Sequence, residues 1–147
     1  MATPQQILKT ARSVLLVDWP SAAVPRSLLE AGLAVYGASP AGYTRAELVA
    51  EPPADLRSHP PERPGDTGHL VFRRLDHRPD HVDLVHAFRP PDEIAGILAT
   101  QAIPLGATAL WLQPPVTSAD ARERAEAAGL DFVEGVDIVD LARGLRH

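Results

Sequence analysis

Short apolar runs alternate with helical patterns along this chain, and that order constrains the fold more than any other feature. Residues 13–17 carry a continuous apolar run, which is typical of a strand buried on both faces of a sheet. In the segment 22–31, apolar residues recur at helical spacing before Gly32, which predicts a short helix with a glycine cap. Residues 33–36 form a second strand candidate. Together these segments predict a βαβ crossover, the unit from which parallel sheets are built.

The same alternation continues through the second half of the chain. It predicts an α/β fold: a three-layer parallel sheet of about five strands with helices on both faces. The other predicted elements are a helix at 4–11, an edge strand at 70–72, a strand at 82–88, a helix from 90 to 104, a strand at 107–112, a helix from 117 to 129, a strand at 131–133 and a helix at 136–145.

The length suits one domain, and we expect residues 1–147 to form a single domain. Residues 40–68 interrupt the alternation, because six of the fifteen prolines gather there with several glycines. We predict a long Pro-rich surface excursion, in which only residues 44–50 have room for a helical turn or two.

The composition narrows the classes of function. The chain has no cysteine, which excludes disulfides, cysteine-bound zinc, iron–sulfur clusters and thiol nucleophiles. Its net charge is -5 and no block of lysine or arginine stands out, so we expect no nucleic-acid partner. The apolar runs are too short to span a membrane and no signal peptide is visible, so a cytoplasmic protein without a membrane partner is expected.

Ligands of open parallel sheets bind beyond the carboxyl ends of the strands, at the point where the strand order reverses. We therefore look for a site among the residues that follow each predicted strand. Those segments are 18–21, 37–40, 86–90 and 113–116.

A family resemblance is carried by several short motifs in the second half. They are Val82-Asp83-Leu84-Val85, Phe88-Arg89-Pro90, Leu105-Gly106-Ala107, Ala109-Leu110-Trp111-Leu112-Gln113 and Ala127-Ala128-Gly129-Leu130. With these motifs, residues 82–133 resemble the small stand-alone CoA-binding domain proteins. Those proteins are Rossmann-like and similar to the nucleotide-binding domain of the succinyl-CoA synthetase alpha subunit. Residues 13–17, 32–36 and the pair Ser39-Pro40 fit the family more loosely.

The resemblance implies CoA binding, with a phosphate grip after the first strand, and this sequence departs from the family there. Asp18 stands where the family has a turn glycine, and the loop is shorter, with Pro20-Ser21 and Arg26-Ser27 as remnants. A glycine lets the backbone approach a pyrophosphate, whereas a carboxylate repels one. Pro115-Val116 also replaces a glycine–valine pair, and the family's terminal aspartate–arginine–cysteine motif is absent around 135–137. These changes indicate a pocket that has drifted or changed its ligand.

Two residues after the strand at 82–88 have competing interpretations. Arg89 is either a bidentate donor to a ligand phosphate or the partner of Asp92 or Glu93 at the start of the next helix. Phe88 either stacks on adenine or completes the core, and composition alone favours the core.

Other candidates are weighed in the same way. Arg26 either supplies positive charge in place of the missing glycine loop or lies on a solvated helix face. Asp18 either accepts ribose hydroxyls or caps a turn, and the cap is favoured because a ribose-binding carboxylate normally follows the second strand. Gln113 either offers its amide to the ligand or caps backbone groups. Trp111 is more typical of packing than of stacking on a ligand.

The sequence offers little support for metal binding or catalysis. His77, His81 and His86 lie within ten residues, but Pro79 breaks the helix that would bring the first two to one face, so no metal is predicted. No glycine–x–serine–x–glycine elbow surrounds a serine, and no P-loop or full glycine fingerprint is present, so no catalytic residue is assigned.

We therefore expect a non-catalytic protein that binds CoA or an acyl-CoA. One alternative is a degenerate Rossmann-fold interaction module that has lost cofactor binding, with residues 40–68 covering the ligand edge or docking a partner. Another is a binder of a different nucleotide such as NAD(P), with Arg26 or Arg45 as the phosphate partner. A homodimer is left open. The predicted cofactor-binding residues are Asp18, Trp19, Pro20, Ser21, Arg26, Ser39, Pro40, Phe88, Arg89, Pro90, Gln113 and Val116.

Overall fold

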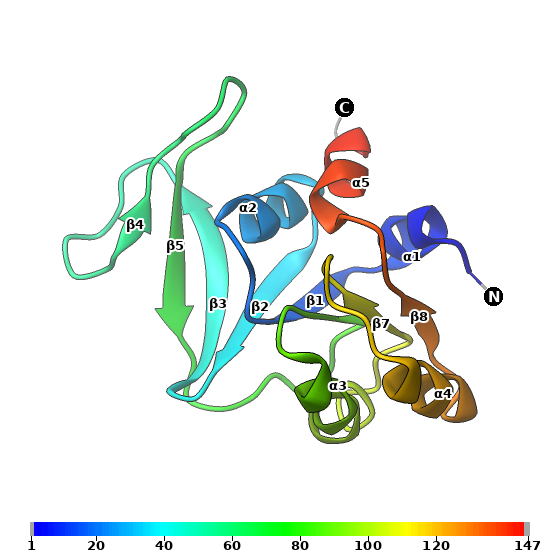
Figure 1. The fold of residues 1–147 in the computed structure, drawn as a ribbon. Helices are drawn as coiled ribbons and strands as arrows, with labels where there is room; N and C mark the ends of the chain where they lie inside the picture. The colour runs from blue at the N-terminus through cyan, green and yellow to red at the C-terminus, as the bar shows by residue number, and fades with distance from the viewer. Residues whose placement is uncertain (1, 146–147) are drawn as a thin grey trace.

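The computed structural model describes residues 2–145, and within them one mixed sheet of eight strands organises the chain (Figure 1). The strand order is β4-β5-β3-β2-β1-β6-β7-β8. The elements in chain order are α1 (Pro4–Thr10), β1 (Ser13–Val17), α2 (Ala23–Glu30), β2 (Ala34–Ser39), β3 (Gly42–Val49), β4 (Ser58–His59), β5 (His69–Arg74), β6 (Leu84–Ala87), α3 (Pro91–Ile97), the π-helical turn η1 (Leu98–Ala102), β7 (Ala109–Leu112), α4 (Ala119–Ala127), β8 (Asp131–Val133) and α5 (Ile138–Gly144).

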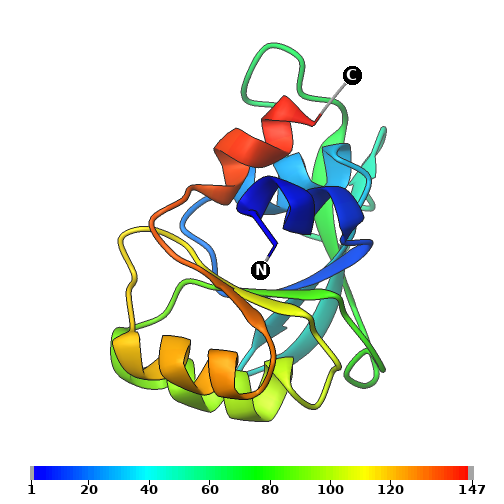
Figure 2. The same cartoon turned by 90° about the vertical axis from the view of Figure 1, so that its right-hand side faces the viewer.

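The parallel part of the sheet has the predicted α/β architecture. Strands β2, β1, β6, β7 and β8 run parallel. Helices α1, α2 and α5 cover one face and α3 and α4 the other, as the view along the sheet shows (Figure 2). The predicted Rossmann-like fold with helices on both faces is confirmed, but the sheet has eight strands and not about five, because β3, β4 and β5 extend it in antiparallel pairing. The continuous apolar runs arise because β1, β6 and β7 are buried on both sides.

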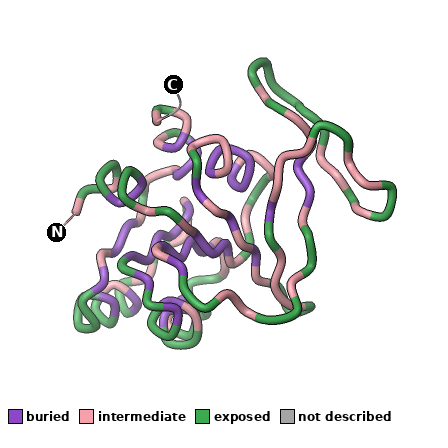
Figure 3. The backbone as a smooth tube through the Cα atoms, turned by 180° about the vertical axis from the view of Figure 1, so that it is seen from behind, coloured by how far each residue is buried: buried purple, intermediate pink, exposed green. Residues whose placement is uncertain are grey.

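Each face of the sheet has its own core. The face under α1, α2 and α5 packs Leu16, Val35 and Trp111, whose indole N–H donates to the carbonyl of Val136 at 2.9 Å. The opposite face packs Leu15 and Val85 against α3 and α4. Burial is concentrated in these central strands, whereas the loops of residues 50–68 are largely exposed (Figure 3).

The segment 40–68 differs from its prediction, because much of it belongs to the sheet. Strand β3 pairs antiparallel with β2 through a tight turn at residues 40–41, and β5 pairs antiparallel with β3. The expected helical turn at 44–50 is therefore wrong. Ala46 and Leu48 pack into the core under α2, and the residue between them points away from it. This alternation is the two-residue period of a strand. The predicted strand at 70–72 is part of β5, which lies between β3 and β4 and is not an edge.

A buried arginine holds this extension against α2. Arg26 is only 4% exposed, and its guanidinium donates to four backbone carbonyls. Those acceptors are His59 at 3.0 Å, Pro60 at 3.3 Å, Thr67 at 3.3 Å and Gly68 at 3.1 Å. The Asp66 carboxylate lies 3.7 Å from Nε. Arg26 thereby joins both sides of the loop between β4 and β5 to the helix.

None of the helices in the described part of the chain has the length and apolar character of a membrane span.

Candidate functional site

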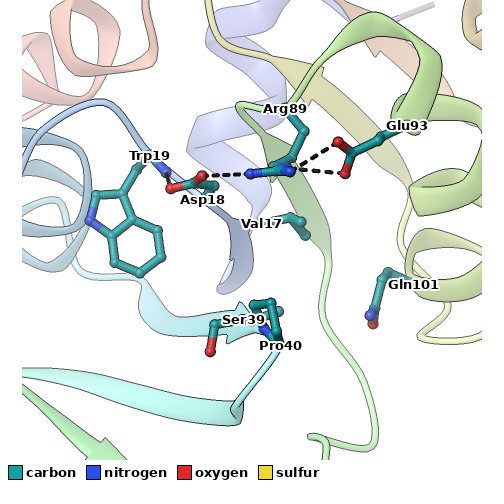
Figure 4. Close-up of a pocket in the computed structure, with 9 residues that line it drawn as sticks. Val17, Asp18, Trp19, Ser39, Pro40, Arg89, Glu93 and Gln101 are labelled. Atoms are coloured by element: carbon teal, nitrogen blue, oxygen red, sulfur yellow. Dashed lines mark hydrogen bonds and ion pairs between the residues drawn. The ribbon is translucent and has the colours of Figure 1, made fainter.

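A cleft of about 360 Å³ opens where β1, β2 and β6 end (Figure 4). It lies at the switch point of the sheet, because the chain leaves β1 for β2 on one side and β6 pairs with β1 on the other. The cleft is lined by Val17, Asp18, Trp19, Ala38, Ser39, Pro40, Arg89, Glu93 and Gln101.

The turn after β1 is built around Asp18. Among residues 2–145 it is the only residue other than glycine with a positive φ, at 65°. Aspartate tolerates this left-handed region better than most side chains. The resemblance places a turn glycine at this position, and glycine adopts this left-handed conformation readily, whereas Asp18 adds a carboxylate there. Its Oδ1 accepts a hydrogen bond from the Trp19 N–H at 2.9 Å.

Arg89 bridges two carboxylates at the mouth of the cleft. Its Nε and Nη2 donate to the two oxygens of Glu93 at 3.1 and 2.9 Å, and its Nη1 donates to Asp18 Oδ2 at 3.2 Å. The pairing with Glu93 is the structural interpretation that the sequence left open beside phosphate binding. The hydrogen bonds that Arg89 donates to Glu93, and then to Asp18, raise the pKa of Arg89. This ion-pair cluster is well exposed, with side-chain exposures of 39% for Arg89, 50% for Asp18 and 44% for Glu93.

The ion-pair cluster leaves the cleft with a surplus of negative charge. One guanidinium faces two carboxylates, so the three side chains together carry one net negative charge at neutral pH. In this arrangement the three side chains offer no net positive charge to a polyanionic ligand.

A second hollow, of about 470 Å³, adjoins the first and is mostly apolar. Asp18 and Arg89 line both hollows, so the ion-pair cluster connects a more polar cleft with a more apolar one. The other residues that line the second hollow are Phe88, Pro90, Pro91, Pro115 and Val116.

Trp19 packs against the sheet at the edge of the cleft. Its ring stacks on Phe72 with centroids 5.2 Å apart and planes 19° from parallel. The ring also crosses β2 at Gly37, where an added Cβ would lie 3.2 Å from the indole and 2.8 Å from Thr44 Oγ1. Glycine at this position thus allows the indole to lie flat at the end of β2.

The structure brings eight of the twelve predicted site residues to the two hollows. Asp18, Trp19, Ser39, Pro40 and Arg89 line the cleft, and Phe88, Pro90 and Val116 line the second hollow. Pro20, Ser21, Arg26 and Gln113 line neither.

Those four residues have other surroundings. Pro20 and Ser21 are exposed in the turn before α2, where the Ser21 hydroxyl accepts from the Ala23 N–H at 3.3 Å. Arg26 binds the loop carbonyls already described. Gln113 is buried, and its Nε2 donates to Asp137 Oδ1 at 2.9 Å.

Gln113 belongs to a buried polar network that also holds His86. The Nε2–H of His86 donates to Gln113 Oε1 at 3.1 Å, and that oxygen also accepts from the Ile138 N–H at 3.3 Å. Burial lowers the pKa of His86 from 6.5 to about 4. The histidine is therefore neutral at physiological pH, and the network connects β6 and β7 to the start of α5.

Sequence reasoning missed Glu93 and Gln101 as cleft residues. The sequence predicts Glu93 only as an ion-pair partner of Arg89 and not as a residue that lines the cleft. Gln101 reaches the cleft from η1 and lies 3.1 Å from the hydroxyl of Tyr43. The π-helical turn shifts the helix register, and a regular 3.6-residue period carries no signal for such a shift.

The remaining histidines do not gather into a site. His81 pairs with Asp83 at 2.8 Å, and His77 lies in the exposed loop before β6. Within the described residues, no cluster of three metal-ligating side chains is found.

The open parallel sheet and its cleft at the switch point define a Rossmann-like α/β protein. The chain belongs to a specific family of this class, the CoA binding domain family, whose model matches residues 16–140. The resemblance stated from the sequence motifs is thereby confirmed.

Several solved structures share the fold. A hypothetical protein from Pyrococcus horikoshii OT3 is 21% identical, with 98% of this chain and 92% of that chain covered and a TM-score of 0.63. A Thermus thermophilus protein is 22% identical, with 98% and 99% covered and a TM-score of 0.55. A protein redesigned for binding is 22% identical, with 97% and 89% covered and a TM-score of 0.61. No match was found among curated proteins.

Proposed function

We propose that this chain binds CoA or an acyl-CoA in the cleft and carries out no catalysis of its own. The observation that carries the proposal is the cleft at the switch point of β1 and β6, in a chain of the CoA binding domain family. Parallel sheets of this kind bind nucleotides at that point because the loops diverge there and leave a crevice.

The two adjoining hollows suit the two chemical parts of such a ligand. The polar part would lie in the cleft, near the hydroxyl of Ser39 and the guanidinium of Arg89. The pantetheine or acyl part would lie against Phe88, Pro90 and Val116 in the more apolar hollow. Concave sites that combine apolar walls with a few polar groups are typical of cofactor binding.

The lining residues support binding without catalysis. Ser39 is the hydroxyl residue of the cleft, and its Oγ lies 3.2 Å from the Ala41 N–H and 3.5 Å from the Gly42 carbonyl. Within the described residues these are its hydrogen-bond partners, and both are backbone groups of its own turn. A serine nucleophile needs a base that takes its proton, so Ser39 is better suited to hold a ligand than to attack one.

Calorimetry and thermal shift with CoA, an acyl-CoA, NAD, NADP and an adenylate test the proposal. A ligand at 100 times its dissociation constant stabilises a protein by roughly 2.7 kcal/mol, which is readily detected. We expect CoA to stabilise the wild type. The variant Arg89→Gln should weaken CoA binding about tenfold or more, because a charge-assisted hydrogen bond to phosphate is lost.

Arg124→Gln is the matched control, since Arg124 forms an exposed i,i+4 pair with Asp120 on α4, much as Arg89 does with Glu93. It should leave CoA affinity unchanged. Absence of any response to CoA at millimolar concentration rejects the proposal, and a response to NADP alone transfers the site to a different nucleotide.

A second candidate is supported by the ion-pair cluster itself. Because Asp18 and Glu93 neutralise Arg89, the chain could be an interaction module whose cofactor site has decayed. This candidate requires that no nucleotide in the panel binds. Light scattering on the same sample would then show whether the protein forms a homodimer.

A further inference from the structure

We propose that Asp18 is an internal competitor for a ligand phosphate, and that its carboxylate must leave Arg89 before CoA binds fully. This inference rests on the proposed function, because it concerns how the same cleft admits its ligand. It assigns Asp18 as the residue that sets affinity and charge selectivity at the turn after β1.

The carboxylate occupies two donors that an anionic ligand needs. Its Oδ1 accepts from the Trp19 N–H at 2.9 Å, and its Oδ2 accepts from Arg89 Nη1 at 3.2 Å. Backbone N–H groups after the first strand and a nearby guanidinium are the groups that hold phosphates in sheets of this class. Asp18 therefore binds the cleft's donors in the way that a phosphate would.

Glu93 has a different part in the cluster. Glu93 lies four residues after Arg89, at the start of α3. Its two carboxylate oxygens accept hydrogen bonds from Nε and Nη2 of the guanidinium. That bidentate contact fixes the plane of the guanidinium and leaves the Nη1 edge facing Asp18. Glu93 thus positions Arg89, whereas Asp18 occupies the edge that remains available to a ligand.

The contact of Asp18 with Arg89 is weak enough to be exchanged. The Asp18 and Arg89 side chains are 50% and 39% exposed, and ion pairs of that exposure contribute little to stability because water screens them. A phosphate group carries more negative charge than a carboxylate and can therefore displace Asp18 from Arg89. The displaced carboxylate stays nearby on the turn and repels the phosphate, so affinity falls without being abolished.

The backbone allows a clean test, because two other residues suit position 18. Asparagine and glycine both accept a φ near 65°. Asp18→Asn keeps an oxygen for the Trp19 N–H and removes the negative charge from Arg89. Asp18→Gly removes the side chain altogether, which covers the case in which the asparagine amide makes a new contact.

Asp92→Asn is the matched control. Asp92 is an exposed residue in the first turn of α3, beside Glu93, and does not line either hollow. The Asp92→Asn substitution removes one negative charge close to the cleft, as Asp18→Asn does, without touching Arg89. Pantetheine is the matched ligand, since it shares the arm of CoA and lacks phosphate.

The experiment is calorimetry of CoA and pantetheine with the wild type, Asp18→Asn, Asp18→Gly and Asp92→Asn. We expect both Asp18 variants to bind CoA about tenfold more tightly than the wild type, because a like charge beside the phosphate is gone. We expect Asp92→Asn to bind CoA like the wild type, and pantetheine affinity to be the same in all four proteins. The gain for CoA should shrink at high salt, where exposed charges are screened.

The outcomes separate this inference from the proposed function. If CoA binds all four proteins with equal affinity, or binds the Asp18 variants more weakly, the inference is wrong and CoA binding stands. If only the Asp18 variants bind CoA, Asp18 is confirmed as the competing group and the wild type is not a CoA binder. If no protein binds CoA, both proposals fail.

Discussion

At the scale of single residues, several polar side chains that the sequence analysis considers as ligand contacts or metal ligands are buried in the fold. Arg26, His86 and Gln113 are all buried and form hydrogen bonds to other groups of the protein, although Nδ1 of His86 has no partner among the described residues. Burying a polar group costs free energy unless it is hydrogen-bonded, so these pairings offset most of the cost of burial. Asp18 and Arg89, by contrast, are charged residues at the strand ends to which a ligand has access.

His86 gives the protein a predictable dependence of stability on pH. Its pKa is lowered by burial from 6.5 to about 4, so the unfolded chain binds a proton at a pH where the folded protein does not. The stabilisation from keeping His86 neutral is complete above pH 6.5 and is lost as the pH falls towards 4. The two values differ by about 2.5 pH units, so about 3 kcal/mol of unfolding free energy is lost across this window.

Urea unfolding at a series of pH values measures this loss. His86→Leu removes the titrating group, and its unfolding free energy should be nearly flat between pH 6.5 and 4, although the variant is less stable overall. His77→Leu, at an exposed position, should keep the wild-type slope. Equal slopes in His86→Leu and the wild type would show that His86 is not the source. Asp66 and Asp83 have lowered pKa values, so their contributions are lost mainly below 3.8, and both residues are present in all three proteins that are compared.

At the scale of elements, Arg26 decides whether the loop between β4 and β5 stays attached to α2. Arg26→Ala leaves four carbonyls and the Asp66 carboxylate without this donor. Breaking a buried charged contact costs about 3 kcal/mol or more. We expect a loss of that order in unfolding free energy, and faster hydrogen exchange in residues 58–70 than elsewhere in the sheet.

Arg63→Ala is the control for this element, because Arg63 is an exposed arginine of the same loop. Its unfolding free energy should change by less than about 0.5 kcal/mol. Arg26→Lys should behave like the alanine variant, since a single ammonium cannot reach acceptors on both sides of the loop. Wild-type exchange rates in Arg26→Ala would contradict the role that we assign to this side chain.

The predictable elements are those that follow one clear period. The runs at β1, β6 and β7 and the capped helices α1 and α4 follow from apolar spacing and cap residues. Strand β3 was missed because proline and glycine surround it and its polar face dilutes the alternation. The position of Gln101 depends on a π-helical turn, and the partners of Arg26 come from 33 to 42 residues away. Contacts of that range have no signature in local sequence.

At the scale of the whole molecule, the sheet separates two ends with different chemistry. Because β1, β2, β6 and β7 are parallel, their carboxyl ends lie at one edge of the sheet. The ion-pair cluster and the two hollows lie at this edge. A third hollow, of about 470 Å³, lies near the loop that precedes β6. It is lined by Tyr36, Arg45, Leu75, Asp76, His77, Pro79, Asp80 and His81. It holds one arginine and two histidines beside two aspartates, so it is the alternative place at which a mixed-charge ligand is tested.

Hydrogen exchange with and without CoA distinguishes these places. Bound CoA should slow exchange in residues 18–22, 39–42 and 88–91, because those backbone segments border the cleft and their amides would be shielded or bonded. Residues 75–83 and 103–108, before β6 and β7, serve as an internal control and should exchange at unchanged rates. Protection confined to 75–83 would move the ligand to the third hollow. Since only the carboxyl ends of the strands present the donors of Trp19 and Arg89 together, we expect protection at that edge.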